Sequence, residues 1–207
     1  MDDELTFRSI KRKDFHALAD IIRRAWNFDA FCSERMAERL GLLYLTNCLC
    51  NQSFNMVALR GGRPVGVIMG RDLKKKEVLL SDLLGMMKNF AIVRMSRKGR
   101  ELLDMFSVFD RIDEDMYKKS AVEFGGELSF FVVDENERGR GTGAKLYYLL
   151  MKYFSEENVN SFYLFTDTSC DFGFYEHMGA VRLDKRTIDL TKHNYKDFAL
   201  FLYGKAR

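Results

Sequence analysis

The segment that decides the fold reads Arg138-Gly139-Arg140-Gly141-Thr142-Gly143-Ala144-Lys145-Leu146. It follows the apolar run 128–133 and precedes an amphipathic stretch, so a strand leads through a glycine-rich turn into a helix. The first N–H groups of a helix have no partner within it, and the positive end of the helix dipole lies behind them. Glycines let the main chain approach a ligand closely, and Arg138 and Arg140 add positive charge. The segment therefore predicts a binding site for a phosphate or pyrophosphate.

Length and composition indicate one domain that spans residues 1–207. A hydrophobic share of 47% suffices for a sizeable core, and a net charge of +3 is too small to favour nucleic-acid binding. Four cysteines without a C-x-x-C pair and only three histidines argue against a metal site. No apolar run is long enough to span a bilayer, and the acidic start Met1-Asp2-Asp3-Glu4 is unlike a signal peptide. We expect a cytoplasmic protein that binds neither membranes nor nucleic acid.

Hydrophobic periodicity predicts a mixed order of elements. A strand, two helices and a hairpin that turns at Gly61-Gly62 come first. An inserted pair of helices follows over about 73–124, with apolar stripes over 79–90 and 102–116. The chain ends with strand, helix, strand, short helix and two strands. This order indicates an α/β (α+β) fold with helices on both faces of one sheet.

Two motifs resemble those of the GNAT superfamily of acyl-CoA-dependent N-acyltransferases. The family's pyrophosphate motif, Q/R-x-x-G-x-G/A, is matched in full by residues 138–143. Its second block, aromatic-Tyr-Glu-x-x-Gly after the next strand, is matched by Phe-Tyr-Glu-His-Met-Gly at 174–179. The likeness covers about 126–190 by motif and the first 70 residues by element order only. Ala180 stands where an aromatic is usual, and Thr168 stands where many members have Asn.

The resemblance implies a GNAT-type, mostly antiparallel central sheet and an N-acetyltransferase that uses acetyl-CoA as acyl donor, with no metal. A primary amine would attack the thioester directly in a ternary complex. Pantetheine would pair with the free edge of the strand ending at Val133, which would splay from its neighbour at 163–165. A main-chain N–H there would stabilise the thioester oxygen. The expected cofactor-binding residues are Phe131, Val132, Val133, Arg138, Gly139, Arg140, Gly141, Thr142, Gly143, Ala144 and Thr168.

Two side chains are candidates for the proton transfers of this reaction. Glu127, near the start of an otherwise apolar strand, resembles the base position of several family members. Alternation along the strand places Glu127, Ser129, Phe131 and Val133 on one face. Tyr175, in the second motif, resembles the acid that protonates the leaving thiolate. The other interpretations are an exposed edge carboxylate for Glu127 and a core aromatic for Tyr175.

Two further sequence patterns suggest other functions, but each fits its motif less well. The glycine turn also fits a dinucleotide fingerprint, but residues 134–138 separate it from the strand and the acid expected about 20 residues later is missing. Cys170 and His177 suggest a thiol nucleophile, although on one helix they would lie roughly 10 Å apart. A buried small residue is the favoured interpretation of Cys170.

Several functional questions stay open at this level. The acceptor amine cannot be inferred, and a non-catalytic acyl-CoA sensor or an acyltransferase for a longer acyl chain are alternatives to the acetyltransferase. The favoured interpretation of the inserted helices is a pair packed on its own core and on the sheet. The alternatives are a lid over the acceptor site, opposite Trp26, Phe28 and Phe31, and a homodimer surface.

Overall fold

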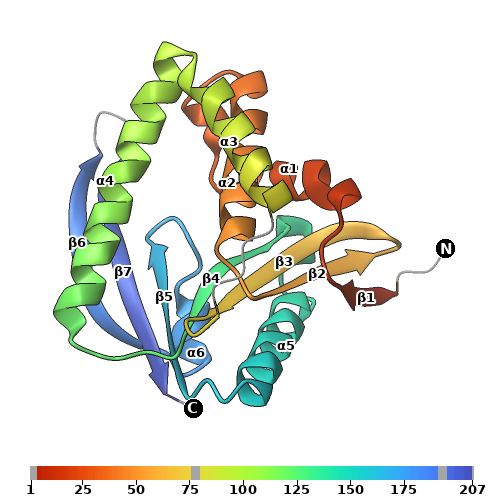
Figure 1. Cartoon of the computed structure of the whole chain (residues 1–207), viewed down its shortest axis with the longest axis vertical. Helices are drawn as coiled ribbons and strands as arrows, with labels where there is room; N and C mark the ends of the chain where they lie inside the picture. Colours follow the sequence, from red (N-terminus) through yellow and green to blue (C-terminus); the bar gives the residue numbers. More distant parts are fainter. Residues whose placement is uncertain (1–3, 76–79, 191–194, 207) are drawn as a thin grey trace.

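The structure is a computed structural model that describes residues 4–75, 80–190 and 195–206 (Figure 1). Its strands form one seven-stranded sheet with the order β1-β2-β3-β4-β5-β7-β6. Every neighbouring pair is antiparallel except β4 with β5, so the mixed, mostly antiparallel sheet is confirmed. The strands are β1 (Leu5–Arg8), β2 (Phe54–Arg60), β3 (Arg63–Asp72), β4 (Gly126–Val133), β5 (Ser161–Asp167), β6 (Val181–Leu190) and β7 (Tyr195–Ala206).

Helices cover both faces of this sheet, as the element order predicted (Figure 1). The face that carries Val57 and Val67 packs on α1 and α2, and the face that carries Ala58 and Ile68 packs on α5. Alternate residues of β2 and β3 therefore belong to two separate cores, as strand geometry requires. The helices are α1 (Phe15–Ala25), α2 (Glu34–Cys50), α3 (Leu80–Arg94), α4 (Arg97–Ser120), α5 (Thr142–Glu156) and α6 (Gly173–His177).

The inserted helices α3 and α4 meet at a tight corner. Ser96 caps α4 by accepting a hydrogen bond from the Gly99 N–H at 2.8 Å. A Cβ at Gly99 would collide with the Val93 carbonyl oxygen, so only glycine permits this approach. From the corner, α4 runs along β6 and β7, and Met116 is buried against Phe198. Both helices are longer than the apolar stripes predicted, and the expected residues 76–79 lie outside the described part of the chain.

The pairing between β4 and β5 is confined to one end. Gly126 pairs with Phe162 and Glu127 pairs with Tyr163, and no later residue of β4 pairs with β5. The edge of β4 that faces β5 is therefore free of a strand partner from Leu128 onward, which agrees with the splay that the family resemblance implies. A free edge presents main-chain N–H and C=O groups that an extended ligand can use.

A β-bulge in β4 changes the predicted facing of its side chains. Met69 of β3 pairs with Phe130 and Gly70 pairs with Leu128, so Ser129 is the extra residue. Beyond the bulge, Phe131 packs on the α5 side of the sheet and Phe130 packs on the α1 and α2 side. The prediction that Glu127, Ser129, Phe131 and Val133 share one face is wrong, because the extra residue reverses the alternation.

No helix in the described ranges combines the length and the apolar composition needed to cross a membrane.

Candidate active site

The glycine loop between β4 and α5 exposes a row of main-chain donors. Gly139 and Gly141 have φ values of 73° and 77°, which residues with a side chain rarely adopt. The first intrahelical bond of α5 runs from the Lys145 N–H to the Gly141 carbonyl at 3.1 Å. Within the described chain, no hydrogen bond uses the N–H groups of the following five residues: Gly139, Gly141, Thr142, Gly143 and Ala144. Unpaired donors at a helix N-terminus bind anions, so the loop suits a diphosphate.

The side chain of Glu137 holds this loop in place from beneath. Its carboxylate accepts two hydrogen bonds from Arg60, at 2.7 and 2.8 Å, and one from the Thr142 hydroxyl at 3.0 Å. Arg140 contacts the same carboxylate at 3.1 Å. The Arg60 guanidinium is the main reason that the pKa of Glu137 lies below its usual value. Sequence reasoning missed this residue, although an acid directly before the glycine run was a visible signal.

The two arginines of the glycine loop differ in whether they form an ion pair with Glu137. Arg138 is exposed beside the loop, and no ion pair involves it in the described part of the chain, whereas Arg140 is paired with Glu137. Thr142 is fully buried and donates to Glu137. Arg138 is therefore positioned to face a ligand, while Arg140 and Thr142 stabilise the loop itself.

A cavity of about 380 Å³, here called the loop groove, runs from the glycine loop along β4. Gly143 packs against β4 with its Cα close to the Phe131 ring, since a Cβ there would lie 3.5 Å from Phe131 Cζ. Neither Arg140, Thr142 nor Thr168 lines the groove; Thr168 is exposed and bonds to Ala199 of β7. The predicted residues that do line it are Phe131, Val132, Val133, Arg138, Gly139, Gly141, Gly143, Ala144 and Tyr175.

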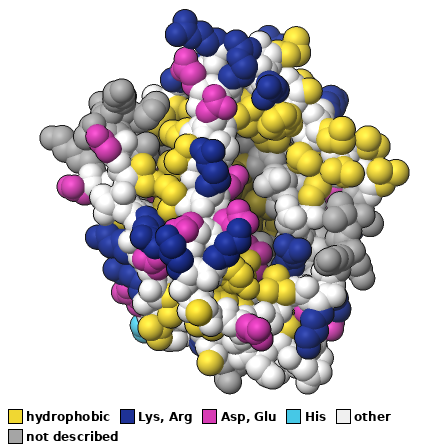
Figure 2. Space-filling model, turned by 60° about the vertical axis from the view of Figure 1, so that its left-hand side comes forward, with side chains coloured by type: hydrophobic (Ala, Val, Ile, Leu, Met, Phe, Trp, Pro, Cys, Tyr) yellow, Lys and Arg dark blue, Asp and Glu magenta, His cyan; other side chains and the backbone are white. Residues whose placement is uncertain are grey.

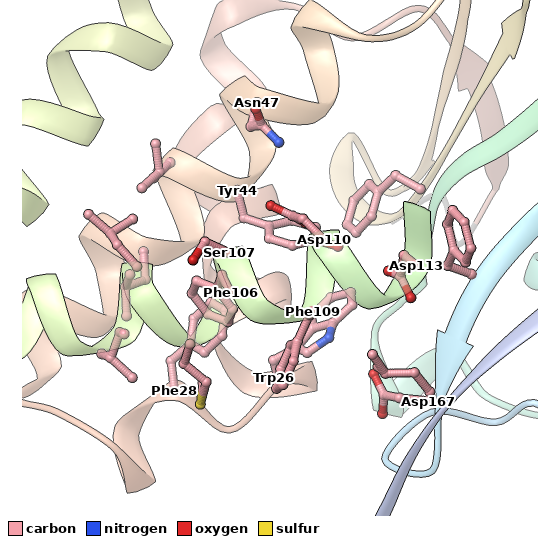
Figure 3. A pocket seen from close by; sticks show the side chains of 18 of the residues that line it. Trp26, Phe28, Tyr44, Asn47, Phe106, Ser107, Phe109, Asp110, Asp113 and Asp167 are labelled. Carbon is pink, nitrogen blue, oxygen red and sulfur yellow. The ribbon is translucent and has the colours of Figure 1, made fainter. Parts of the chain in front are cut away.

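A second cavity of about 560 Å³, here called the helical cavity, lies between α2, α4 and the splayed ends of β4 and β5 (Figure 3). The inserted helices line it opposite Trp26, Phe28 and Phe31, the wall that the lid interpretation named. Trp26 stacks on Phe130 with ring centroids 5.7 Å apart. Five residues line both cavities, which therefore meet at this point: Trp26, Phe131, Ser169, Cys170 and Tyr175.

Tyr175 of α6 lies at this junction with its hydroxyl available. The side chain is 8% exposed, and burial is the main reason that its pKa is raised, so the hydroxyl keeps its proton at neutral pH. No hydrogen bond in the described chain uses that hydroxyl. Tyr175 packs on Phe174 and Tyr203, which fix the ring, and its free hydroxyl can donate to a ligand.

Glu127 lies near the helical cavity but lines neither the helical cavity nor the loop groove. Burial raises the pKa of its carboxyl, and a hydrogen bond from the Tyr163 hydroxyl opposes this rise. Because of the bulge it faces the side of the sheet that carries α2 and α4, where its charge adds to the rise that burial causes in the pKa of the Cys48 thiol. A proton from the cavity would reach Glu127 through another group.

Asp113 of α4 projects into the helical cavity near Glu127, Asp110 and Asp167 (Figure 3). Its Oδ1 atom is buried and has no hydrogen-bond partner in the described chain. Burial and these three like charges raise the pKa of Asp113 to about 7. Sequence reasoning missed it, although Asp113 interrupts the apolar helical stripe 102, 106, 109 and 116.

The raised pKa of Asp113 predicts a pH-dependent gain in stability on its removal. The unfolded carboxyl loses its proton near pH 3.8 and the folded one near 7, so this group reduces stability progressively as pH rises through that range. We expect Asp113→Asn to raise the thermal midpoint by roughly 5 °C at pH 8, which is about 2 kcal/mol for a domain of this size. The gain should vanish near pH 4. Thermal unfolding at both pH values, with the exposed Glu114→Gln as control, tests this; a gain that is equal at pH 4 and 8 would contradict it.

The environment of Cys170 does not favour the thiolate form that a nucleophile needs. Burial raises the pKa of its thiol to about 11, and Asp167 adds to the rise. A thiol with such a pKa is protonated at neutral pH. The residue is half-buried and lines both cavities, so the interpretation as a buried small residue is only partly met. Among the described residues, no group of three His, Cys, Asp or Glu side chains is arranged to hold a metal ion.

Comparison with known proteins identifies the family. The profile of the Acetyltransferase (GNAT) family matches residues 15–180, which is most of the chain. The chain belongs to this family. The resemblance drawn from the two motifs is confirmed, and acetyl-CoA is the acyl donor that the GNAT fold binds. No curated protein matches the chain.

Several solved structures share the fold over almost the whole chain. SsHAT is 14% identical, covers 98% of each chain and has a TM-score of 0.63. PH1933 from Pyrococcus horikoshii OT3 is 15% identical over 99% of each chain, with a TM-score of 0.59. The Drosophila melanogaster polyamine N acetyltransferase is 12% identical, covers 99% of this chain and 100% of its own, and has a TM-score of 0.57. At such identities these likenesses show a common fold.

Proposed function

We propose that this GNAT protein transfers an acetyl group from acetyl-CoA to a primary amine by direct attack within a ternary complex. The observation that carries the proposal is the meeting of two cavities at Tyr175. One of them ends on five unpaired main-chain N–H groups, and the other is roomy enough for a small acceptor. The Drosophila enzyme, whose name describes a polyamine acetyltransferase forming N-acetylagmatine, is an amine-acetylating relative in fold.

The loop groove matches the shape of the donor. A diphosphate on the N–H groups of residues 139–144, beside Arg138, would direct the pantetheine arm along the free edge of β4. The thioester would then lie near Phe131, where both cavities meet. Main-chain N–H groups of residues 131–133 that face the missing strand partner are candidates to stabilise the thioester oxygen as it gains charge.

The reaction forms one bond and breaks one. The neutral amine nitrogen attacks the carbonyl carbon, the C–N bond forms, and the C–S bond breaks to release coenzyme A. In our proposal Tyr175 donates its proton to the leaving sulfur, which its free, protonated hydroxyl supports. The nitrogen loses one proton, and we propose Glu127 as its final acceptor, through water or a nearby group, because Glu127 lines neither cavity.

A matched pair of glycines tests the donor site. Gly141 and Gly62 have φ values of 77° and 79°, and an added Cβ would meet no atom within 4 Å at either one. Valine therefore strains both turns alike, at a cost of order 1–3 kcal/mol. We expect Gly141→Val to weaken acetyl-CoA binding at least tenfold in titration calorimetry, because its side chain would occupy the diphosphate position. Gly62→Val should bind like the parent.

The outcomes of that titration separate the alternatives. Equal affinity of both variants, or no binding of acetyl-CoA by the parent, would refute the proposed function. Tight acetyl-CoA binding without thiol release in the presence of any amine would favour a non-catalytic sensor. The helical cavity opens onto the thioester position, which leaves room for a longer acyl chain. Stronger competition by butyryl-CoA or decanoyl-CoA than by acetyl-CoA would favour that donor.

A further inference from the structure

The helical cavity has two chemically different parts (Figure 3). Towards β4 and β5 its wall is acidic, with Asp110 and Asp113 projecting from α4 and Asp167 at the end of β5. Away from the sheet the wall is aromatic and aliphatic, and Phe28 and Phe106 come close with ring centroids 6.2 Å apart. The acidic part of the cavity is therefore nearer than the apolar part to the junction of the two cavities, where acyl transfer would take place.

None of these three carboxylates has a cationic partner in the described chain, and two of them lack a hydrogen bond as well. Asp167 accepts hydrogen bonds from the Ser169 N–H and hydroxyl, and Glu127 behind the wall has Tyr163. Within the described residues neither Asp110 nor Asp113 forms an ion pair or a hydrogen bond; Asp110 is exposed, whereas Asp113 is half-buried and its Oδ1 atom is buried. A half-buried carboxylate without a partner is costly unless a ligand supplies the positive charge.

The remaining charges in the cavity balance each other. Arg94 and Asp104 line it further along the inserted helices and carry opposite charges. The charged groups close enough to act on Asp113 are Asp110 on its own helix, Asp167 at the end of β5 and Glu127 on β4. None of these three supplies a cation. The uncompensated negative charge is thus confined to the end next to the sheet.

We propose that the acceptor is a primary amine with one ammonium group and an apolar, aromatic-sized body. Asp110 and Asp113 receive the ammonium group, and the body lies between α2 and α4 against Phe28, Phe106 and Phe109. The cavity volume of about 560 Å³ accommodates one ring and its linker. A linear diamine would place its second cation towards the aromatic and aliphatic part, where Arg94 and Asp104 together contribute no net negative charge. This proposal names the acceptor class and rests on the proposed function.

Asp113 is also in position to take the first proton. The bound ammonium must lose a proton before attack, and the unpartnered Oδ1 of Asp113 is an acceptor inside the cavity. Transfer from the nitrogen to Oδ1 leaves a neutral amine and a protonated Asp113, and the proton then leaves through Glu127 or solvent. The inserted helix α4 therefore supplies both the recognition and the activation of the acceptor.

Direct binding measurements test the site without depending on turnover. The probes are 2-phenylethylamine, the uncharged 2-phenylethanol and 1,4-diaminobutane, titrated calorimetrically into the full chain at pH 7.5. We expect 2-phenylethylamine to bind at least tenfold more tightly than either of the others. Asp113→Asn and Asp110→Asn should each weaken its binding about tenfold, because a hydrogen bond to a charged group is lost. Phe106→Ala should weaken it as well, and Glu114→Gln, paired with Lys118 outside the cavity, should not.

Each result decides the proposal. Equal or tighter binding of 1,4-diaminobutane, no measurable binding of 2-phenylethylamine, or unchanged binding in both aspartate variants would overturn it. The pH profile also tests the proton role, because Asp113→Asn should remove the limb of kcat/KM near pH 7, the parameter that reports groups of the free protein. Binding of 2-phenylethylamine with no acetyl transfer to it would leave the acceptor site standing and refute the proposed function.

Discussion

Replacing Tyr175 by phenylalanine should lower the rate of acetyl transfer by about 100-fold or more and leave acetyl-CoA affinity within about twofold. The substitution removes one hydroxyl that lies at the junction of the two cavities and has no partner in the described chain. Without it, the leaving thiolate must be expelled unprotonated or take its proton from water. The ring and its contacts with Phe174 and Tyr203 stay, so folding should be preserved.

Steady-state kinetics of thiol release and calorimetric titration with acetyl-CoA measure the two quantities separately. Tyr148→Phe is the matched control, because Tyr148 is 68% exposed on α5 and lines neither cavity. Parent-like turnover in Tyr175→Phe would rule out the acid role. A fall in kcat that is matched by loss of acetyl-CoA binding would mean that Tyr175 holds the donor and does not protonate the leaving sulfur.

Glu137→Ala should destabilise the fold by about 3 kcal/mol and weaken acetyl-CoA binding at least tenfold. The side chain of Glu137 is 5% exposed and that of Arg60 is 16% exposed, so the substitution removes a nearly buried carboxylate and the two hydrogen bonds that Arg60 donates to it. Thr142, at the first turn of α5, loses its anchor as well. Removing the carboxylate also removes a negative charge near the diphosphate position, which by itself would strengthen acetyl-CoA binding. Because Arg60 already offsets that charge, this gain is small. The loss of loop order therefore determines the expected change in affinity.

Denaturant unfolding and acetyl-CoA titration check both parts of this prediction. Glu135→Ala serves as control, because Glu135 lies in the same turn, is exposed, and has only a long contact of 3.9 Å to Arg24. Glu137→Gln keeps the side-chain length and one acceptor oxygen. Its stability and its acetyl-CoA affinity should therefore lie between those of Glu137→Ala and Glu135→Ala. If Glu137→Ala bound acetyl-CoA as the parent does, the carboxylate would not be what orders the loop.

The charges around Asp113 connect stability with function. A carboxyl held near three other carboxyls costs folding free energy, and nothing in the described chain compensates it. Binding sites commonly keep such unfavourable arrangements because a ligand relieves them. The expected gain in stability of Asp113→Asn at high pH and its expected loss of amine binding are therefore two consequences of one arrangement.

Local chemistry is what the sequence by itself determined. The strand, turn and helix around residues 138–146 follow from an apolar run, from glycines that permit positive φ, and from the unpaired N–H groups that every helix start leaves. These causes act within about ten residues, so the loop and the second motif identified the GNAT family before any contact was known. The element order also predicted a mixed sheet with helices on both faces, since each amphipathic element must bury one side.

Long-range packing decided the rest. The bulge at Ser129 arises from how β4 pairs with β3, and it moved Glu127 to the face opposite Phe131. Asp113 reaches the site only because α4, inserted between β3 and β4, folds back across β7. Pairing register and the approach of distant segments depend on contacts across the whole chain, which periodicity cannot specify. Tertiary structure alone therefore brought the acidic wall of the helical cavity and the Glu137–Arg60 pair to the same region as the glycine loop.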